Sequence, residues 1–298
     1  MSILVLGGNG QVGFELLRSL APLGTVVPTT RSGMLDDGSP CETLDLDHAD
    51  AIAPLLDRIR PEVVVNATAY TAVDRAEDEP DAAFRANAFA PGVLAGWCAA
   101  NAATLVHYST DYVFDGAGAR PYREADPVAP LGVYGASKLA GEQAIAESGA
   151  NHLILRTAWV YGLRGGNFLR TMLRVGAERD ELRVVGDQHG TPTPAWLIAD
   201  ATAAILSQGI RTAGVRHLVA GGQTTWRGFA ESIFDEAVAR GLMARAPRVV
   251  PIATAEYPTR ASRPAWSVLD TSRLSSEYGL ALPDWRSALA TTFDRGAH

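Results

Sequence analysis

Short apolar runs alternate with longer stretches of helical periodicity over the first 160 residues. The apolar runs predict buried strands, and the periodic stretches between them predict helices. The strands are expected at 2–7, 25–28, 62–68, 104–110 and 152–160, and the helices at 10–24, 47–59, 79–103 and 134–149. Continuously apolar strands joined through helices are typical of a parallel sheet covered on both faces. Right-handed crossovers then predict an α/β fold with a Rossmann-type, doubly wound parallel sheet.

The pattern becomes irregular after residue 160. Helical periodicity returns at 165–180, 196–210 and 225–242, a strand is indicated at 215–222, and proline and arginine mark a loop at 257–266. No repeat, low-complexity tract or flexible linker separates the two halves. We therefore expect an NAD(P)-binding domain over 1–160 and a smaller substrate-binding lobe over 161–298. A segment at about 191–220 is expected to return to the first domain.

Composition and charge exclude several classes of protein. The chain has 298 residues, 47% of them hydrophobic, and a net charge of −7, without the basic stripe of a nucleic-acid-binding protein. Cys41 and Cys98 lie far apart and match neither a zinc site nor a disulfide framework. No run is long enough to cross a membrane, and the apolar start at 2–7 is too short for a signal sequence. We expect a reducing, cytoplasmic location, and no metal, nucleic-acid or membrane partner.

A glycine-rich turn follows the first predicted strand. Gly7, Gly10 and Gly13 end this strand and open the next helix. Glycines at this place allow a tight turn, and they let backbone N–H groups at the helix N-terminus approach a pyrophosphate. Glycines also occur in ordinary strand-to-helix turns. Their position directly after a buried first strand is what predicts a dinucleotide site.

The end of the second strand bears on the choice of cofactor. Sites that prefer NAD usually carry an acidic residue there, whereas this chain has Thr30 and Arg31. A guanidinium can pair with a 2′-phosphate in a forked geometry, so NADPH is favoured and NADH stays possible. The alternative is a solvated loop arginine. Further on, Asp45 and Leu46 could contact the adenine, although Asp47 could equally cap a helix.

Tyr134 and Lys138 are four positions apart in a predicted helix, so their side chains share one face. An enzyme that reduces a ketone needs a proton donor, and the pKa of free tyrosine, about 10, is high for that task. A nearby ammonium and a positive nicotinamide ring would lower it. Thr110 and Asp111 end the strand at 104–110, where ligands bind in open α/β sheets. We therefore predict that Tyr134, Lys138 and Thr110 are catalytic.

These residues together resemble the extended short-chain dehydrogenase/reductases, and within them the dTDP-4-dehydrorhamnose reductase family. The resemblance runs along almost the whole chain, through NATAYTAVDRAE (66–77), HYSTDYVFDG (107–116), VYGASKLAGE (133–142), LRTAWVYG (155–162), NFLRTMLR (167–174), DQHGTPT (187–193) and SRPAWSVLDTSRL (262–274). The motifs are specific as a set. They imply NADPH-dependent reduction of the C4 ketone of dTDP-4-dehydro-L-rhamnose in dTDP-rhamnose biosynthesis.

The resemblance also implies roles for individual residues. Tyr134 would donate the proton, and Thr110 would polarise the ketone oxygen. Lys138 would adjust the pKa of the Tyr134 phenol and hold the nicotinamide ribose. The implied cofactor-binding residues are Gly7, Gly10, Gln11, Val12, Gly13, Thr30, Arg31, Asp45, Leu46, Ala67, Ala69, Tyr70, Thr71, Tyr134 and Lys138. The implied substrate-binding residues are Thr110, Asp111, Trp159, Asn167 and Arg263, with Arg260 as an alternative to Arg263 for the diphosphate. Trp159 could instead be a core residue, Asn167 a helix cap and Arg263 a surface loop residue.

One departure from the family concerns oligomers. Some members dimerise through a magnesium ion held by acidic residues. This chain keeps Glu15 but has Trp196 where a carboxylate would be needed, and magnesium requires oxygen ligands. We therefore expect a monomer or a weak homodimer without magnesium.

Two other functions stay open. The chain could be a reductase or epimerase of another nucleotide sugar, or a non-catalytic nucleotide-binding regulatory subunit of the same fold. The retention of Thr110, Tyr134 and Lys138 argues against the regulatory subunit, because such a protein does not need all three.

Overall fold

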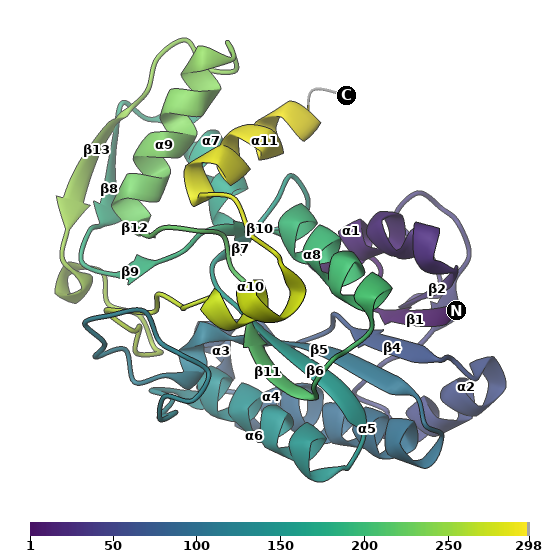
Figure 1. Cartoon of the computed structure of the whole chain (residues 1–298). Helices are drawn as coiled ribbons and strands as arrows, with labels where there is room; N and C mark the ends of the chain where they lie inside the picture. The colour runs from purple at the N-terminus through teal and green to yellow at the C-terminus, as the bar shows by residue number, and fades with distance from the viewer. Residues whose placement is uncertain (297–298) are drawn as a thin grey trace.

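The computed structural model describes residues 1–296, and a seven-stranded parallel sheet forms its centre (Figure 1). The strand order is β11–β6–β5–β4–β1–β2–β3. These strands are β1 (Ser2–Leu6), β2 (Thr25–Thr30), β3 (Glu42–Thr43), β4 (Val63–Asn66), β5 (Thr104–Thr110), β6 (Asn151–Thr157) and β11 (Gly214–His217). Every neighbouring pair is parallel. The predicted α/β fold with a doubly wound parallel sheet is confirmed.

Helices cover both faces of this sheet (Figure 1). One face packs against α1 (Gln11–Leu20), α8 (Ala195–Gln208) and α10 (Ser272–Tyr278), and the other against α2 (Ile52–Ile59), α5 (Ala90–Ala100) and α6 (Val133–Glu147). In β1, Ile3 and Val5 enter the first core, whereas Leu4 and Leu6 enter the second. Successive side chains of a strand point to opposite faces, so a strand buried on both sides is apolar throughout.

A further core lies in the lobe at the upper left of Figure 1. It is built by α7 (Phe168–Glu178), α9 (Trp226–Ala239) and α11 (Trp285–Arg295) with the parallel strands β8 (Glu181–Val185) and β13 (Arg248–Ile252). The chain also forms two short pairs of strands outside the central sheet. They are β7 (Val160–Tyr161) with β10 (Thr193–Pro194), and β9 (His189–Gly190) with β12 (Thr224–Thr225).

The chain passes between the sheet and the lobe several times. After α7 and β8 in the lobe, α8 packs on α1 and β11 pairs with β6. The chain then builds α9 and β13 in the lobe, returns to the sheet with α10, and ends in the lobe with α11. The division of the chain near residue 160 stays a prediction, and α10 packs against the sheet although its residues fall in the second half.

Several elements differ from the sequence expectation. The helix expected at 79–103 consists of α4 (Pro80–Phe84), a π-helical turn, η3 (Arg85–Phe89), and α5, and a proline lies in the first turn of both α4 and α5. The short helix α3 (Val73–Ala76), the strands β8 and β13, and the helices α10 and α11 were not predicted. Single 3₁₀ turns form at Ala21–Leu23, Ala49–Ala51, Asp111–Val113 and Thr254–Glu256.

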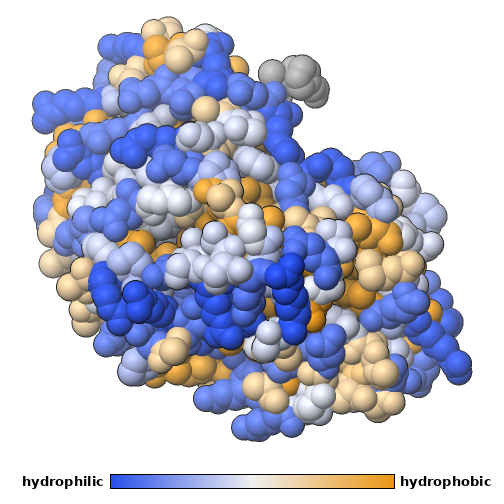
Figure 2. Space-filling view, in the orientation of Figure 1, coloured by the Kyte–Doolittle hydropathy of each residue, from blue (hydrophilic) through white to orange (hydrophobic). Residues whose placement is uncertain are grey.

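Figure 2 shows hydrophilic side chains over most of the visible face, with apolar side chains in separate patches. The apolar side chains of the strands are instead collected in the buried cores. Among residues 1–296, no helix combines the length and the apolarity that crossing a membrane requires.

Candidate active site

The glycine turn after β1 is shaped for a close approach to the backbone. Gly7 has a φ of 85°, in the left-handed region, and its N–H donates to the Thr29 carbonyl at 3.2 Å. A Cβ atom on Gly13 would overlap the Gly7 carbonyl. Within residues 1–296, no side chain caps α1, and its first turn carries no acidic residue. The first N–H groups of α1 can therefore bind an anion, so the turn fits a dinucleotide pyrophosphate.

The loop after β2 contains the residues predicted to choose the cofactor. The buried Thr30 hydroxyl accepts from the Met34 N–H and donates to the Met34 carbonyl, both at 3.1 Å, so it shapes the loop. Arg31 is exposed, and no hydrogen bond or ion pair engages its guanidinium in the described part of the chain. Arg31 is thus available for a phosphate. Farther on, Leu46 is buried in the second core, and the Asp45 carboxylate accepts from the Asp47 N–H at 3.1 Å.

Asp47 does not act as the helix cap considered as its alternative. The 3₁₀ turn at Ala49–Ala51 has His48 at its N-cap, and within residues 1–296 no side chain caps that turn or α2.

The segment that follows β4 is held in place by Asn87, a residue that the sequence analysis missed. The Tyr70 N–H donates to Asn87 Oδ1 at 2.8 Å, and Asn87 Nδ2 donates to the Tyr70 carbonyl at 3.1 Å. Asn87 Nδ2 also reaches Ser137 Oγ on α6 at 3.0 Å. Asn87 is fully buried in the π-helical turn, and such turns are frequent at functional sites. One amide in an alanine-rich helical segment was the available signal.

The predicted nicotinamide-side residues lie along this tethered segment. Ala67 is half-buried beside the glycine turn, because its carbonyl oxygen borders Gly7. Ala69 and Thr71 are exposed, whereas Tyr70 is half-buried and its hydroxyl donates to Glu79 at 2.7 Å.

The carboxyl end of β5 holds a buried carboxylate. Thr110 Oγ1 donates to Asp111 Oδ1 at 3.0 Å, while Asp111 Oδ2 and Ser109 Oγ lack hydrogen-bond partners among the described residues. Burial raises the pKa of Asp111 to about 6, and the nearby hydroxyls of Ser267 and Thr110 oppose that rise. A buried polar atom without a partner costs free energy. Asp111 Oδ2 is therefore placed to accept a hydrogen bond from a ligand hydroxyl.

Tyr134 lies in the first turn of α6, whose N-terminal Val133 N–H donates to Glu77 at 2.8 Å. Its ring meets the ring of Tyr112 edge to face, with centroids 5.7 Å apart. Burial raises the pKa of Tyr134, and the nearby Thr110 hydroxyl opposes that rise in part. The structure therefore brings the phenol and the Thr110 hydroxyl together.

Lys138 is buried one turn further along α6. Its Nζ donates to the Tyr108 carbonyl at 2.6 Å and lies 3.0 Å from Nε2 of His107. Burial lowers the pKa of Lys138 to about 8, against the opposing charge of Glu142.

The predicted effect of Lys138 on the pKa of Tyr134 stays a prediction. In the chain alone, burial raises the pKa of the phenol, whereas the predicted lowering concerns a phenol beside both the ammonium and a bound nicotinamide. In the described structure, Lys138 Nζ is held by contacts with β5 and makes no hydrogen bond to Tyr134.

The predicted sugar residue Trp159 has an unusual backbone. Its φ is 47°, in the left-handed region, which is an outlier for a bulky side chain. Its ring stacks on Trp226 with centroids 3.6 Å apart, and a Cβ on Gly190 would overlap it. Strained conformations persist where the surrounding structure holds them, frequently at binding sites.

Asn167 takes the alternative role of a helix cap. Its Oδ1 accepts from the Arg170 N–H at 3.1 Å at the start of α7. Its Nδ2 donates to Gln11 Oε1 and to the Gly162 carbonyl, each at 2.8 Å. Asn167 thus links the lobe to the glycine turn, while its contact with a substrate stays a prediction.

The two candidate arginines of the 257–266 loop form ion pairs with α3 and the residues after it. Arg263 pairs with Asp74 at 2.6 Å, and Arg260 pairs with Asp78. The Arg263 side chain is 18% exposed, which argues against a surface loop residue. It also reaches the Tyr112 hydroxyl at 3.5 Å, next to Tyr134.

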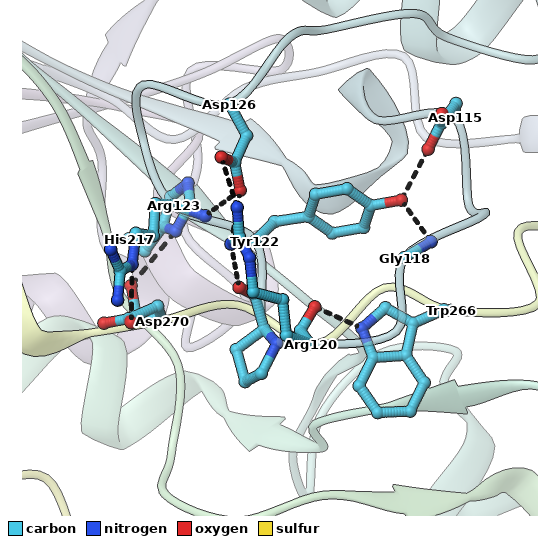
Figure 3. Close-up of polar contacts among 10 residues, drawn as sticks. Asp115, Gly118, Arg120, Tyr122, Arg123, Asp126, His217, Trp266 and Asp270 are labelled. Carbon is cyan, nitrogen blue, oxygen red and sulfur yellow. Dashed lines mark hydrogen bonds and ion pairs between the residues drawn. The ribbon is translucent and has the colours of Figure 1, made fainter.

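The loop between Thr110 and Tyr134 is fastened to the C-terminal segment (Figure 3). The Tyr122 hydroxyl donates to Asp115 at 2.5 Å and accepts from the Gly118 N–H at 2.8 Å. Trp266 Nε1 donates to the Arg120 carbonyl at 2.9 Å. Because Trp266 follows Arg263 by three residues, this network holds the arginine segment beside the site.

Comparisons with known proteins agree along the whole chain. The RmlD substrate binding domain family matches residues 1–297. A dTDP-4-dehydrorhamnose reductase from Burkholderia thailandensis is 49% identical over 300 residues, covering 97% of each chain. The structure of such a reductase from Clostridium acetobutylicum is 35% identical, with a TM-score of 0.90 over 100% of both chains. That of the Bacillus anthracis enzyme in complex with NADP is 33% identical, with a TM-score of 0.86 over 98% of both.

Proposed function

The chain belongs to the RmlD substrate binding domain family, and from this we propose that it is an NADPH-dependent dTDP-4-dehydrorhamnose reductase of dTDP-rhamnose biosynthesis. It reduces the C4 ketone of dTDP-4-dehydro-L-rhamnose to the hydroxyl of dTDP-L-rhamnose. The observation that carries this proposal is the set of Thr110, Tyr134 and Lys138. They lie at or beside the carboxyl end of β5, the same edge of the parallel sheet as the glycine turn after β1.

The residues that would hold NADPH fit its charges. The N–H groups at the start of α1 suit the pyrophosphate, and Arg31 suits the 2′-phosphate. When bound, NADPH supplies the hydride for the ketone carbon and becomes a positively charged nicotinamide.

The side chains provide the proton and the charge. Tyr134 gives its hydroxyl proton to the ketone oxygen as the carbon–oxygen π bond breaks, and it is left as a phenolate. Thr110 donates a hydrogen bond that stabilises the negative charge on this oxygen. The Lys138 ammonium stabilises the phenolate from one turn away on α6. Burial strengthens each of these interactions because it excludes water.

The substrate contacts belong to the same proposal. Asp111 Oδ2 accepts from a sugar hydroxyl, Trp159 lies against the sugar, and Arg263 reads the diphosphate. We also propose a cytoplasmic enzyme, supported by the two free cysteines.

We propose a monomer or a weak homodimer without a bridging magnesium ion. Glu15 pairs with Arg18, and Trp196 packs under Arg295 and donates to Thr292. The indole of Trp196 thus takes the place that an oxygen ligand would need.

The direct test is NADPH oxidation with enzymatically prepared dTDP-4-keto-6-deoxy sugars, with NADH measured beside it. Replacing Tyr134→Phe should lower kcat by about 10²–10⁴-fold, because the proton donor is lost. The Kd for NADPH should stay within about twofold, since no phosphate contact changes.

Other outcomes would separate the alternatives. An epimerase would consume no net NADPH, and a regulatory subunit would bind NADPH without turning over any sugar. A Tyr134→Phe variant that kept more than about a tenth of the wild-type kcat would remove Tyr134 from the role of general acid.

A further inference from the structure

Three buried polar side chains form a line behind the site. Asn66 ends β4, His107 lies opposite it in β5, and Lys138 faces them from α6. Each is at most 1% exposed. Asn66 Nδ2 lies 3.1 Å from His107 Nδ1, and His107 Nε2 lies 3.0 Å from Lys138 Nζ. The proposed function gives no role to Asn66 or His107.

The orientation of the Asn66 amide follows from its other contacts. Its Oδ1 accepts from the Thr68 N–H at 3.1 Å and from the Thr68 hydroxyl at 2.5 Å. A backbone N–H can only donate, so the amide oxygen must face Thr68. Its nitrogen therefore faces His107 and can only donate there.

This orientation fixes the tautomer of His107. Because Asn66 donates to Nδ1, that nitrogen carries no proton. Burial holds the pKa of His107 well below its usual value, so the ring is neutral. A neutral imidazole carries one proton, which must then lie on Nε2 and point at Lys138 Nζ.

The protonation state of Lys138 decides whether its Nζ can accept this proton. An ammonium has three donors and no lone pair, whereas an uncharged amine can accept the His107 proton and still donate to the Tyr108 carbonyl. The titratable groups nearest to Lys138 along α6 are Tyr134, one turn before it, and Glu142, one turn after it, while Glu147 ends the helix. Glu142 favours the ammonium, but it is itself held by the buried Arg156 at 2.9 and 2.6 Å.

We propose that His107 is a positioning residue for Lys138. The Nε2–H of His107 donates to Nζ of Lys138, holds Nζ against the Tyr108 carbonyl and stabilises the uncharged amine. This inference rests on the proposed function only where turnover is measured. Since Lys138 loses its charge above a pKa of about 8, turnover should fall as the pH rises through that value. Loss of the His107 donor should move this fall to higher pH.

Two amide variants separate the contacts of His107. His107→Gln places an N–H near the position of Nε2 and keeps a donor for Lys138. His107→Asn reaches only as far as Nδ1, so it keeps the contact with Asn66 and loses Lys138. We expect the alkaline limb of the kcat–pH profile to move up by about one pH unit in the Asn variant, and to stay near wild type in the Gln variant. An unmoved limb in the Asn variant, or an equal shift in both, would overturn the proposal.

The tautomer can be observed without turnover. In ¹⁵N-histidine-labelled protein saturated with NADP, the ring signal that disappears in His107→Gln should show the Nε2–H tautomer. An Nδ1–H or a doubly protonated ring would refute the proposal even if both variants kept their activity. Absence of any sugar reduction by the wild type would instead refute the proposed function, and the tautomer would still decide the role of His107.

Discussion

At the scale of single residues, Asp111 is a buried carboxylate whose Oδ2 has no hydrogen-bond partner among the described residues. Its pKa rises from 3.8 to about 6 on folding, so its contribution to stability is full at low pH and is lost as the pH rises through 6. At pH 7.5 the ionised group lowers the free energy of unfolding by roughly 3 kcal/mol at most. We expect Asp111→Asn to raise Tm at pH 7.5, with a gain that shrinks towards pH 5, and to raise KM for the sugar.

Asp126 offers a control of opposite sign. Its hydrogen bonds with Arg120 and the Arg123 N–H lower its pKa to about 2, so the ionised form stabilises the fold at neutral pH. Asp126→Asn should therefore lower Tm at pH 7.5. The test is to measure Tm of Asp111→Asn and Asp126→Asn at two pH values. Changes of Tm in the same direction at pH 7.5 would contradict the predicted opposite signs.

Arg31 gives a prediction about the choice of cofactor. Arg31→Ala should raise KM for NADPH by about 10–100-fold, because a charge-assisted pair with the 2′-phosphate is lost. KM for NADH should change by less than about twofold, since NADH lacks that phosphate. Arg31→Lys keeps the charge without the fork and should lie between the two. Steady-state kinetics with both cofactors test this prediction. An equal rise in KM for NADH would exclude a contact of Arg31 with the 2′-phosphate.

The residues that the sequence could indicate are those with a local signature. Tyr134 and Lys138 are one helical turn apart, and Thr110 ends an apolar strand, so spacing alone placed them on the expected elements. The partners of Asn87 and His107 lie on other elements and come close only in the fold. A polar residue inside an apolar run can be recognised in the sequence, but the sequence does not show which residue it contacts in the fold.

At the scale of elements, α6 lies so close to the π-helical turn that a Cβ on Gly141 would overlap the Asn87 carbonyl. Gly141→Ala should therefore lower the free energy of unfolding by about 1–3 kcal/mol and displace α6, which lowers kcat as well. Gly96 is a matched control, because it is exposed on α5 and nothing lies within 4 Å of its added Cβ. Gly96→Ala should stabilise by about 0.5–1 kcal/mol. Urea unfolding with kcat measurements tests the pair, and two variants of equal stability would contradict it.

The elements that the sequence indicated poorly are those whose burial depends on distant partners. β8 is only five residues long and alternates exposed with buried positions, and its partner β13 lies more than 60 residues later. The segment at 79–103 is rich in alanine throughout, so its pattern predicts one helix, although α4 and α5 each have a proline in their first turn. Parallel strands buried on both faces, by contrast, are visible in their own residues.

At the scale of the whole molecule, the first 160 residues do not complete their own sheet. Within the described chain, β11 pairs with β6, and α8 and α10 cover Val106, Leu153 and Leu155. A fragment of residues 1–160 should therefore expose this apolar face and show no cooperative unfolding transition, whereas the full chain should show one. Circular dichroism on heating measures both, and a cooperatively folding fragment would support an independent first domain.

Because the chain passes repeatedly between the sheet and the lobe, the sheet is completed only late in synthesis. The ribosome makes the glycine turn first, but β11 emerges more than 50 residues after β6, and α10 follows later still. At about 5–20 residues per second, the half-covered sheet waits for several seconds with its apolar face open to other chains. The nascent chain thus meets its greatest risk of aggregation before the last helices leave the ribosome, and a binding site formed by the earliest residues becomes usable only after the latest ones have folded.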